Sequence, residues 1–201
     1  MNKLAETVLP TRWGIFRMIA YQNKLEDMPH LALVSGAIEG DIPVIVRIHS
    51  ECMTGDVFGS VRCDCGEQLE AALRRIAQDG GVLLYLRQEG RGIGLVNKMH
   101  AYNLQDQGFN TADANTQLGF GVDERAFDIA VFMLQDLGVR RIRLLTNNPE
   151  KIAAFDKADV VVEERLPLSI PPREENLHYL QTKRLLMGHI LDLPANGSAH
   201  H

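Results

Sequence analysis

Three cysteines, Cys52, Cys63 and Cys65, make up the entire thiol content of the chain and fall within one short window. Three thiols cannot all pair with one another as disulfides. Three thiolates can instead hold a zinc ion and leave its fourth tetrahedral position open for water, which is the mark of a catalytic zinc. The cluster therefore predicts metal-assisted hydrolysis.

The spacing of the cysteines leaves three interpretations open. In an extended backbone, Cys63 and Cys65 would project to the same side, with Asp64 facing the opposite way, and a loop would bring in Cys52. Three buried, inert cysteines are one alternative. The other is a closed structural site with His49 as fourth ligand. Structural sites more often use pairs spaced C-x₂₋₄-C, and the single close pair here favours the open site.

Arginine is concentrated near the cysteines, at Arg47, Arg62, Arg87 and Arg91, in a chain whose net charge is −5. Planar guanidinium groups bind phosphate through paired hydrogen bonds, so this density predicts an anionic substrate, although a set of solvated surface arginines is the alternative. Arg91 lies between glycines after an expected strand, at the edge where α/β sheets bind ligands. In the same loop, Glu89 could accept hydrogen bonds from an amino-substituted base.

The run TNNPEK, residues 146–151, follows an expected strand and begins a helix. Asn148 is an N-cap residue and Pro149 occupies the first helical position. Backbone N–H groups at this helix start, with Lys151 in the first turn, predict a site for an anion. An ordinary cap with an exposed lysine explains the segment equally well.

The elements that must position these residues alternate in the second half of the chain and follow a strand-rich first part. Apolar spacing predicts helices over 67–79, 95–107 and 124–137, ended by Gly80, Gly108 and Gly138. Short β-branched or apolar runs predict strands over 44–48, 82–86, 142–145 and 160–162. Residues 167–176 are an expected Pro-rich loop. The pattern indicates a mixed α/β fold.

The 201-residue chain is 45% hydrophobic and 23% charged, which is typical of a globular protein. We expect one domain over residues 1–192 and a disordered tail over 193–201. The net charge disfavours general nucleic-acid binding. No stretch reaches the apolar length of a membrane span, and the N-terminus lacks a signal-peptide pattern. With reduced cysteines, these features predict a cytoplasmic protein without membrane partners.

The runs RIHSECMTGDVFGSVRCDCGEQLEAAL, LYLRQEGRGIGLVNKMHAYNLQDQG, NTQLGFGVDERAFDIA, RLLTNNPEKI and HYLQTKRLLMGH together resemble GTP cyclohydrolase II. That family carries out the first committed step of riboflavin biosynthesis. The likeness spans roughly residues 4–192. Leu86 and Glu67 depart from the pattern. The match begins at the N-terminus, which predicts the single-function form, and the family is typically a homodimer.

The resemblance implies roles for individual residues. Cys52, Cys63 and Cys65 match zinc ligands. Asp123 is similar to a proton acceptor, Arg125 to a nucleophile toward the α-phosphorus, and Tyr102 to a tyrosine tied to ring hydrolysis. A protonated guanidinium is a poor nucleophile, so an electrostatic role for Arg125 stays open. The implied GTP contacts are Arg47, Ile48, His49, Ser50, Glu51, Gln68, Glu89, Gly90, Arg91, Thr111, Thr146 and Lys151.

The implied reaction is zinc-dependent hydrolysis of GTP. Water opens the imidazole ring and C8 leaves as formate, while Mg²⁺ bridges the phosphates and pyrophosphate is released. The product is 2,5-diamino-6-ribosylamino-4(3H)-pyrimidinone 5′-phosphate. Two alternatives stay open: a paralogue that stops at the formamide or uses another base, and a zinc-stabilised binding module without catalysis.

Overall fold

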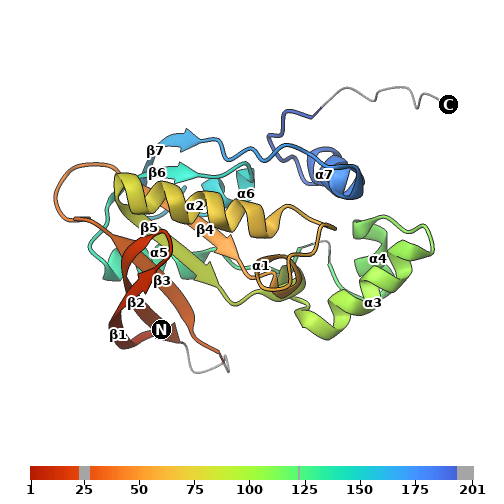
Figure 1. Ribbon diagram of the computed structural model, residues 1–201, viewed down its shortest axis with the longest axis horizontal. Helices are drawn as coiled ribbons and strands as arrows, with labels where there is room; N and C mark the ends of the chain where they lie inside the picture. The colour runs from red at the N-terminus through yellow and green to blue at the C-terminus, as the bar shows by residue number, and fades with distance from the viewer. Residues whose placement is uncertain (23–27, 122, 194–201) are drawn as a thin grey trace.

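The computed structural model describes residues 1–22, 28–121 and 123–193, apart from the side chains of Thr111, Ala112 and His178. Its strands form one mixed sheet in the order β1-β2-β3-β5-β4-β6-β7 (Figure 1). The expected mixed α/β fold is confirmed. The strands are β1 Asn2–Thr11, β2 Gly14–Gln22, β3 His30–Ser35, β4 Val44–Ser50, β5 Gly81–Leu86, β6 Arg141–Leu145 and β7 Val161–Leu166.

The sheet changes from antiparallel to parallel at β5. Strands β1, β2, β3 and β5 pair antiparallel, whereas β5, β4, β6 and β7 run parallel. The carboxyl ends of β5, β4 and β6 therefore meet at one edge of the sheet, where open α/β sheets bind ligands.

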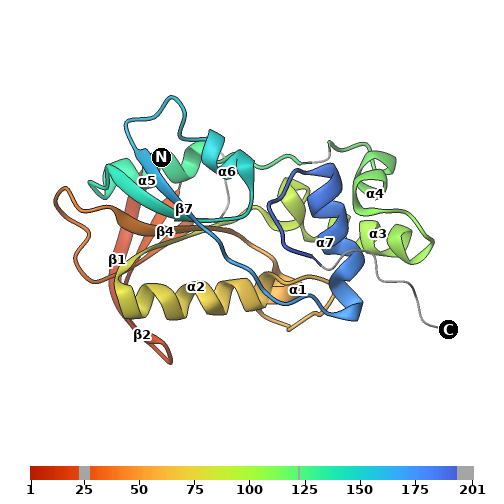
Figure 2. The ribbon, with the colours of Figure 1, turned by 90° about the horizontal axis from the view of Figure 1, so that it is seen from above.

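Helices cover both faces of the sheet and gather beyond that edge. Figure 2 shows α2 on one face, α5 and α6 on the other, and α3, α4 and α7 grouped to one side. The helices are α1 Met53–Asp56, α2 Cys65–Asp79, α3 Gly94–Asp106, α4 Thr111–Gln117, α5 Asp128–Asp136, α6 Pro149–Ala153 and α7 Glu174–Leu186, with a 3₁₀ turn at Glu89–Gly92.

Alternation along the central strands builds a core on each face. In β5, Val82 and Leu84 join the core beneath α5, while Leu83 joins the core beneath α2. Burying such side chains contributes about 1.5–3 kcal/mol each. Ile76 of α2 and Met133 of α5 are fully buried against the two faces. The sheet is thus held from both sides, and its carboxyl edge is fixed in place.

The expected helices over 67–79 and 95–107 and the Asn148–Pro149 helix start are confirmed, as are the strands. The expected helix start at residue 124 is wrong, because α5 begins at Asp128 and ends at Asp136. The Glu124 N–H instead donates to the Arg91 carbonyl at 3.0 Å. This bond holds Glu124 beside the 3₁₀ turn instead of in a helix.

The C-terminal part of the chain contains structure that the sequence pattern did not indicate. The expected loop over 167–176 ends early, because α7 begins at Glu174, with the Asn176 side chain accepting from the Arg173 N–H at 2.8 Å. Helix α4 was also not expected. The expected tail lies, from residue 194 on, outside the described residues. Among those described, no helix is both long and apolar enough to cross a membrane.

Gly81 tests the contact between β5 and β4. A Cβ at Gly81 would lie 2.3 Å from the Ile45 carbonyl oxygen, and its φ of +140° disfavours other residues. We expect Gly81→Ala to lower the free energy of unfolding by about 1–3 kcal/mol through overpacking, in addition to the backbone cost. Chemical denaturation measures this. Gly138→Ala is the control, because φ is +75° there but no heavy atom lies within 4 Å. Equal losses in the two variants would contradict the contact.

Candidate active site

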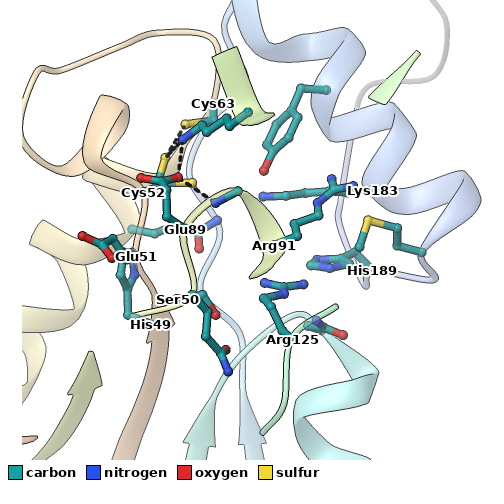
Figure 3. A pocket seen from close by; sticks show the side chains of 18 of the residues that line it. His49, Ser50, Glu51, Cys52, Cys63, Glu89, Arg91, Arg125, Lys183 and His189 are labelled. Carbon is teal, nitrogen blue, oxygen red and sulfur yellow. Dashed lines mark hydrogen bonds and ion pairs between the residues drawn. The ribbon is translucent and has the colours of Figure 1, made fainter. Parts of the chain in front are cut away.

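A pocket of about 1090 Å³, open to solvent, lies beyond the carboxyl ends of β4, β5 and β6. Segments from residue 47 to residue 189 contribute to its walls, and Figure 3 shows their side chains converging. It brings together most of the site residues that the sequence indicated. These are Arg47, His49, Ser50, Glu51, Cys52, Cys63, Cys65, Gln68, Glu89, Gly90, Arg91, Tyr102, Arg125, Thr146 and Lys151.

Among the expected site residues whose side chains are described, two do not line the pocket. Ile48 is fully buried in the core beneath α5, and only its carbonyl faces the site, accepting from the Lys151 Nζ at 2.8 Å. Asp123 instead accepts a hydrogen bond from the Arg125 side chain. Thr111 is the first residue of α4, and its side chain is not among those described.

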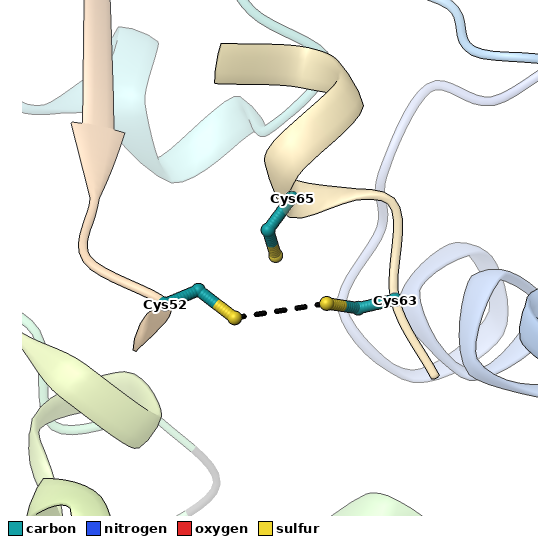
Figure 4. A group of neighbouring side chains, drawn as sticks. All are labelled: Cys52, Cys63 and Cys65. Carbon is teal, nitrogen blue, oxygen red and sulfur yellow. Dashed lines mark hydrogen bonds between the residues drawn. The ribbon is translucent and has the colours of Figure 1, made fainter. Parts of the chain in front are cut away.

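The three thiols point toward one another (Figure 4). Their Sγ atoms all lie within 4.8 Å of one another, and those of Cys52 and Cys63 are 3.6 Å apart. All three cysteines are free of disulfides. Tetrahedral zinc with Zn–S bonds of about 2.3 Å separates thiolates by about 3.8 Å, so the observed spacing fits a metal ion. The interpretation as unrelated inert cysteines is not supported by this convergence.

The backbone brings the thiols together differently from the expected extended segment. Residues 61–64 form turns, and Cys65 is the first residue of α2. Asp64 does not face away from the site, because its carboxylate accepts from Lys183 Nζ at 3.0 Å and from the Gln68 amide. A turn followed by a helix start therefore replaces the expected strand.

Close packing of α1 against α2 brings Cys52 to the other two cysteines. A Cβ at Gly66 would lie 2.4 Å from the Gly55 carbonyl oxygen. A Cβ at Gly55 would lie 3.1 Å from the Cys63 Sγ and 3.3 Å from the Cys52 Sγ. Only the absence of side chains at both glycines permits this approach.

His49 does not close the thiol cluster. Its Nε2 lies 3.0 Å from each Asp56 carboxylate oxygen, and its ring stacks on Tyr85. Burial lowers the pKa of His49, and Asp56 only partly offsets that effect. Among the described residues, the group of possible ligands contains only the three cysteines. The Cys₃His alternative is therefore not supported, and no carboxylate or imidazole of that part of the chain fills a fourth position.

Lys98 lies beside the cluster, although the sequence analysis assigned it no role. Its Nζ donates to the Cys52 Sγ at 3.1 Å and to the Glu89 Oε1 at 2.8 Å. Hydrogen bonds from the Cys63 and Cys65 thiols, together with this ammonium, lower the pKa of Cys52. Burial opposes the protonated form of Lys98, but Cys52 and Glu89 outweigh it and raise the Lys98 pKa. A positively charged ammonium group therefore lies beside the thiol cluster.

Cations dominate the pocket wall. Among the described side chains, seven cationic ones line it against two carboxylates, Glu51 and Glu89. Burial, followed by the charges of Arg47, Arg125 and Lys183, holds the pKa of Lys151 well below its ordinary value. Such mutual repulsion is relieved by an anionic ligand. The seven are Arg47, Arg62, Arg91, Lys98, Arg125, Lys151 and Lys183.

Arg91 is held in an uncommon backbone conformation within the 3₁₀ turn. Its φ is +62°, in the left-handed region that non-glycine residues rarely adopt. Both of its terminal nitrogens are buried without a hydrogen-bond partner among the described residues. Buried donors are normally paired, so this guanidinium is poised for an acceptor from a ligand.

Asp123 and Arg125 form a two-pronged ion pair. The Asp123 Oδ1 accepts from the Arg125 Nε at 2.8 Å, and its Oδ2 contacts the Arg125 Nη2. Burial would lower the Arg125 pKa, but the hydrogen bond and charge of Asp123 outweigh burial and raise it. Arg125 is therefore a fixed positive charge.

Of the other expected arginines, Arg47 donates to the Leu145 carbonyl and to the Gln68 side chain, whereas Arg62 and Arg87 have carboxylate partners. Arg62, at the pocket rim, donates to Asp106 at 2.9 Å, and Arg87 pairs with Glu51 at 3.1 Å. The residues that the sequence analysis missed are Lys98, Tyr179, Lys183 and His189. The runs LVNKMHAY and HYLQTKRLLMGH carried them, but neither run has metal-ligand or phosphate-loop spacing.

A family model and the most similar curated proteins that we compared indicate the same family. Residues 2–167 match the family model described as GTP cyclohydrolase II. Riboflavin biosynthesis protein RibBA of Bacillus cereus is 57% identical over 194 residues, covering 96% of this chain and 49% of that protein. RibBA of Bacillus cytotoxicus is 53% identical with the same coverage. The chain spans about half the length of the curated relatives it matches.

A solved structure gives a weaker likeness. RibBX of A. baumannii, a two-domain 3,4-dihydroxy-2-butanone 4-phosphate synthase, matches with a TM-score of 0.46 and 22% identity. The match covers 80% of this chain and 39% of that chain.

Gly66→Ala tests the packing that brings the thiols together. The added methyl group must push α1 from α2, at a cost of about 1–3 kcal/mol, which corresponds to roughly 5- to 150-fold weaker Zn²⁺ binding. Titration against a competing chromophoric chelator measures this. Gly59→Ala is the control, because φ is +67° in the same loop but nothing lies within 4 Å. Equal Zn²⁺ affinities in the two variants would show that the close approach is unimportant.

His189 predicts acid sensitivity. Burial, and then the charges of Lys183, Lys151, Arg125 and Arg91, lower its pKa to about 3. The unfolded chain, with a His pKa of about 6.5, therefore binds more protons between these values, and stability falls as pH falls through that window.

His189→Asn should flatten this loss in urea unfolding measured between pH 6.5 and pH 4 without nucleotide. His49 contributes in the same direction in both proteins. His100→Asn, which removes an exposed imidazole from α3, is the matched control. An unchanged slope in His189→Asn would contradict an imidazole that stays neutral in the folded protein.

Proposed function

The chain belongs to the GTP cyclohydrolase II family, and on that premise we propose that it hydrolyses GTP in riboflavin biosynthesis. The reaction opens the imidazole ring, releases C8 as formate and pyrophosphate from the triphosphate, and yields 2,5-diamino-6-ribosylamino-4(3H)-pyrimidinone 5′-phosphate. The observation that carries this proposal is one pocket in which a three-thiol cluster lies beside a wall of cations.

The metal of this proposal is zinc, held by Cys52, Cys63 and Cys65. The sulfur donors, their spacing and the lack of a fourth ligand among the described His, Cys, Asp and Glu groups fit a zinc ion with an accessible position. Such an ion supplies an activated water for hydrolysis near neutral pH. Lys98 and Glu89 then orient the Cys52 side of the cluster through hydrogen bonds.

Tyr102 is the residue we assign to the ring chemistry. Its hydroxyl lies 3.3 Å from the Thr54 Oγ1, which in turn lies 3.6 Å from the Cys52 Sγ. Burial raises the Tyr102 pKa, so the phenol keeps its proton and remains a donor beside the thiols. The guanine must lie at this side of the pocket for C8 to reach the activated water.

The triphosphate then extends toward the cations, and Mg²⁺ bound with it would neutralise part of the phosphate charge. Arg125 acts there as an electrostatic stabiliser rather than as a nucleophile, because a protonated guanidinium has no free electron pair. Asp123 holds that guanidinium in position with both carboxylate oxygens. This geometry gives Asp123 a positioning role in the state described, and proton acceptance would require the ion pair to separate.

The proposed GTP contacts are Arg47, His49, Ser50, Glu51, Gln68, Glu89, Gly90, Arg91, Thr111, Thr146 and Lys151, with Ile48 contributing its backbone. Gln68 supports Arg47, whose Nη2 donates to it at 2.6 Å. We further propose a cytoplasmic homodimer, on the resemblance and composition alone.

Cys52→Ser tests the zinc reaction. Wild-type protein incubated with GTP and Mg²⁺ should release formate and pyrophosphate, with the pyrimidinone identified by mass spectrometry. In Cys52→Ser we expect formate release to fall by at least about 100-fold, because one of three ligands is lost. Zinc content is measured in the same samples.

Thermal unfolding of zinc-free and zinc-loaded wild type separates the alternatives. A folded zinc-free protein that lacks formate release supports the enzyme. A protein that unfolds without zinc would instead support the binding module. Accumulation of the formamide without formate would replace the complete reaction by its truncated form.

A further inference from the structure

The C-terminal part of the described chain forms one wall of the pocket. Tyr179, Lys183, Met187 and His189 line it, from α7 and the loop that follows. All four lie beyond residue 167, where the match to the family model ends. The loop is fixed against the end of β6, because the Ile190 N–H donates to the Asn147 carbonyl at 2.9 Å.

Lys183 carries its charge into the pocket from α7. It is 9% exposed, and its Nζ donates to the Asp64 Oδ1 at 3.0 Å and lies 4.4 Å from the centre of the Tyr179 ring. An ammonium group has three N–H donors, and one of them is donated to Asp64. The Lys183 side chain lines the same pocket as Arg91 and Arg125.

His189 lies among cations. Lys183, Lys151, Arg125 and Arg91 all act on it electrostatically, and Figure 3 shows it grouped with three of them, away from Glu51 and His49. Its Nε2 is buried and has no hydrogen-bond partner among the described residues, as is true of both terminal nitrogens of Arg91. A neutral imidazole can donate from that nitrogen without adding to the repulsion.

These groups share one requirement, which is a ligand with several negative oxygens. A neutral purine would relieve none of the repulsion among the cations, whereas a phosphate chain supplies both charge and acceptors. In the proposed reaction, the guanine end of the nucleotide lies at the thiol side of the pocket.

Resting on that proposed function, we propose that Lys183 and His189 bind the triphosphate of the nucleotide, which makes α7 and its following loop a substrate-binding element. The phosphate site is therefore built from both halves of the chain. The residues of this site that come from the second half of the chain increase the affinity for the phosphates and do not affect the affinity for the base.

Matched charge removals on α7 test this assignment. Lys183→Met and the control Arg184→Met each remove one positive charge, but Arg184 does not line the pocket. Calorimetric titrations with inorganic triphosphate and with guanosine, in the presence of Mg²⁺, give two affinities for each protein. We expect Lys183→Met to weaken triphosphate binding roughly tenfold, with guanosine affinity unchanged and Arg184→Met like wild type.

His189→Ala provides a second measurement, because Lys183→Met also leaves Asp64 without its ammonium. We expect His189→Ala to weaken triphosphate binding several-fold with unchanged zinc content, and Lys183→Arg to restore most of the affinity lost in Lys183→Met. Wild-type triphosphate affinity in either Lys183→Met or His189→Ala would overturn that residue's role. An equal loss of guanosine affinity, or no triphosphate binding by the wild type, would overturn the proposal.

Formate release from GTP by the wild type is measured separately. Its absence would refute the proposed reaction, while the titrations would still decide whether α7 binds a phosphate chain. The two failures are therefore distinguishable.

Discussion

Repulsion among buried cations is the constraint on which the site depends. A chain with a net charge of −5 gathers seven of its described cationic side chains around one pocket. Each buried cation needs a partner to offset its desolvation. Lys151 uses a carbonyl, Arg125 uses Asp123 and Lys183 uses Asp64. Arg91 has none for its terminal nitrogens in the described chain. The fold holds this charge in place and leaves part of the compensation to the ligand.

Strand β4 connects the two kinds of chemistry. It pairs with β5 and β6 at the centre of the parallel part of the sheet. Arg47 and His49 lie near its carboxyl end, and Cys52 follows directly. Asp56 fixes this junction, since it accepts from the Cys52 N–H at 2.9 Å and from the Tyr85 hydroxyl at 2.9 Å. The position of a thiol relative to the cations is therefore set by one strand and one buried carboxylate.

The sequence was informative where residue type decides the chemistry. Three clustered cysteines, the glycine-flanked Arg91 and the Asn148 cap were each identified from type and spacing, and the structure brings them to one edge. The path of the backbone was less predictable. Cys63 and Cys65 are joined by a turn and a helix start, because α1 packs against α2 through Gly55 and Gly66. That contact joins two helices that are separate along the chain, so no local sequence pattern predicts it.

Helix α7 was missed for a physical reason. Apart from the buried Leu180, it buries the polar residues Asn176, Thr182 and Lys183 while exposing Leu185 and Leu186. A helix that faces a polar pocket reverses the hydrophobic pattern that identifies helices from sequence. The same reversal concealed Lys183, whose ion-pair partner Asp64 lies far away along the chain. His189 follows the helix, and the charges around it also come from distant segments.

The thiols and the cation wall differ in where they lie along the chain. Cys52, Cys63, Cys65 and Lys98 all belong to its first half, whereas Lys183 and His189 come close to its end. Synthesis proceeds from the N-terminus, so the residues that could hold a metal ion leave the ribosome long before those that complete the cation wall. All three thiols are therefore present in the nascent chain while the cation wall still lacks Lys183 and His189, so the two parts of the pocket are completed at different stages of synthesis.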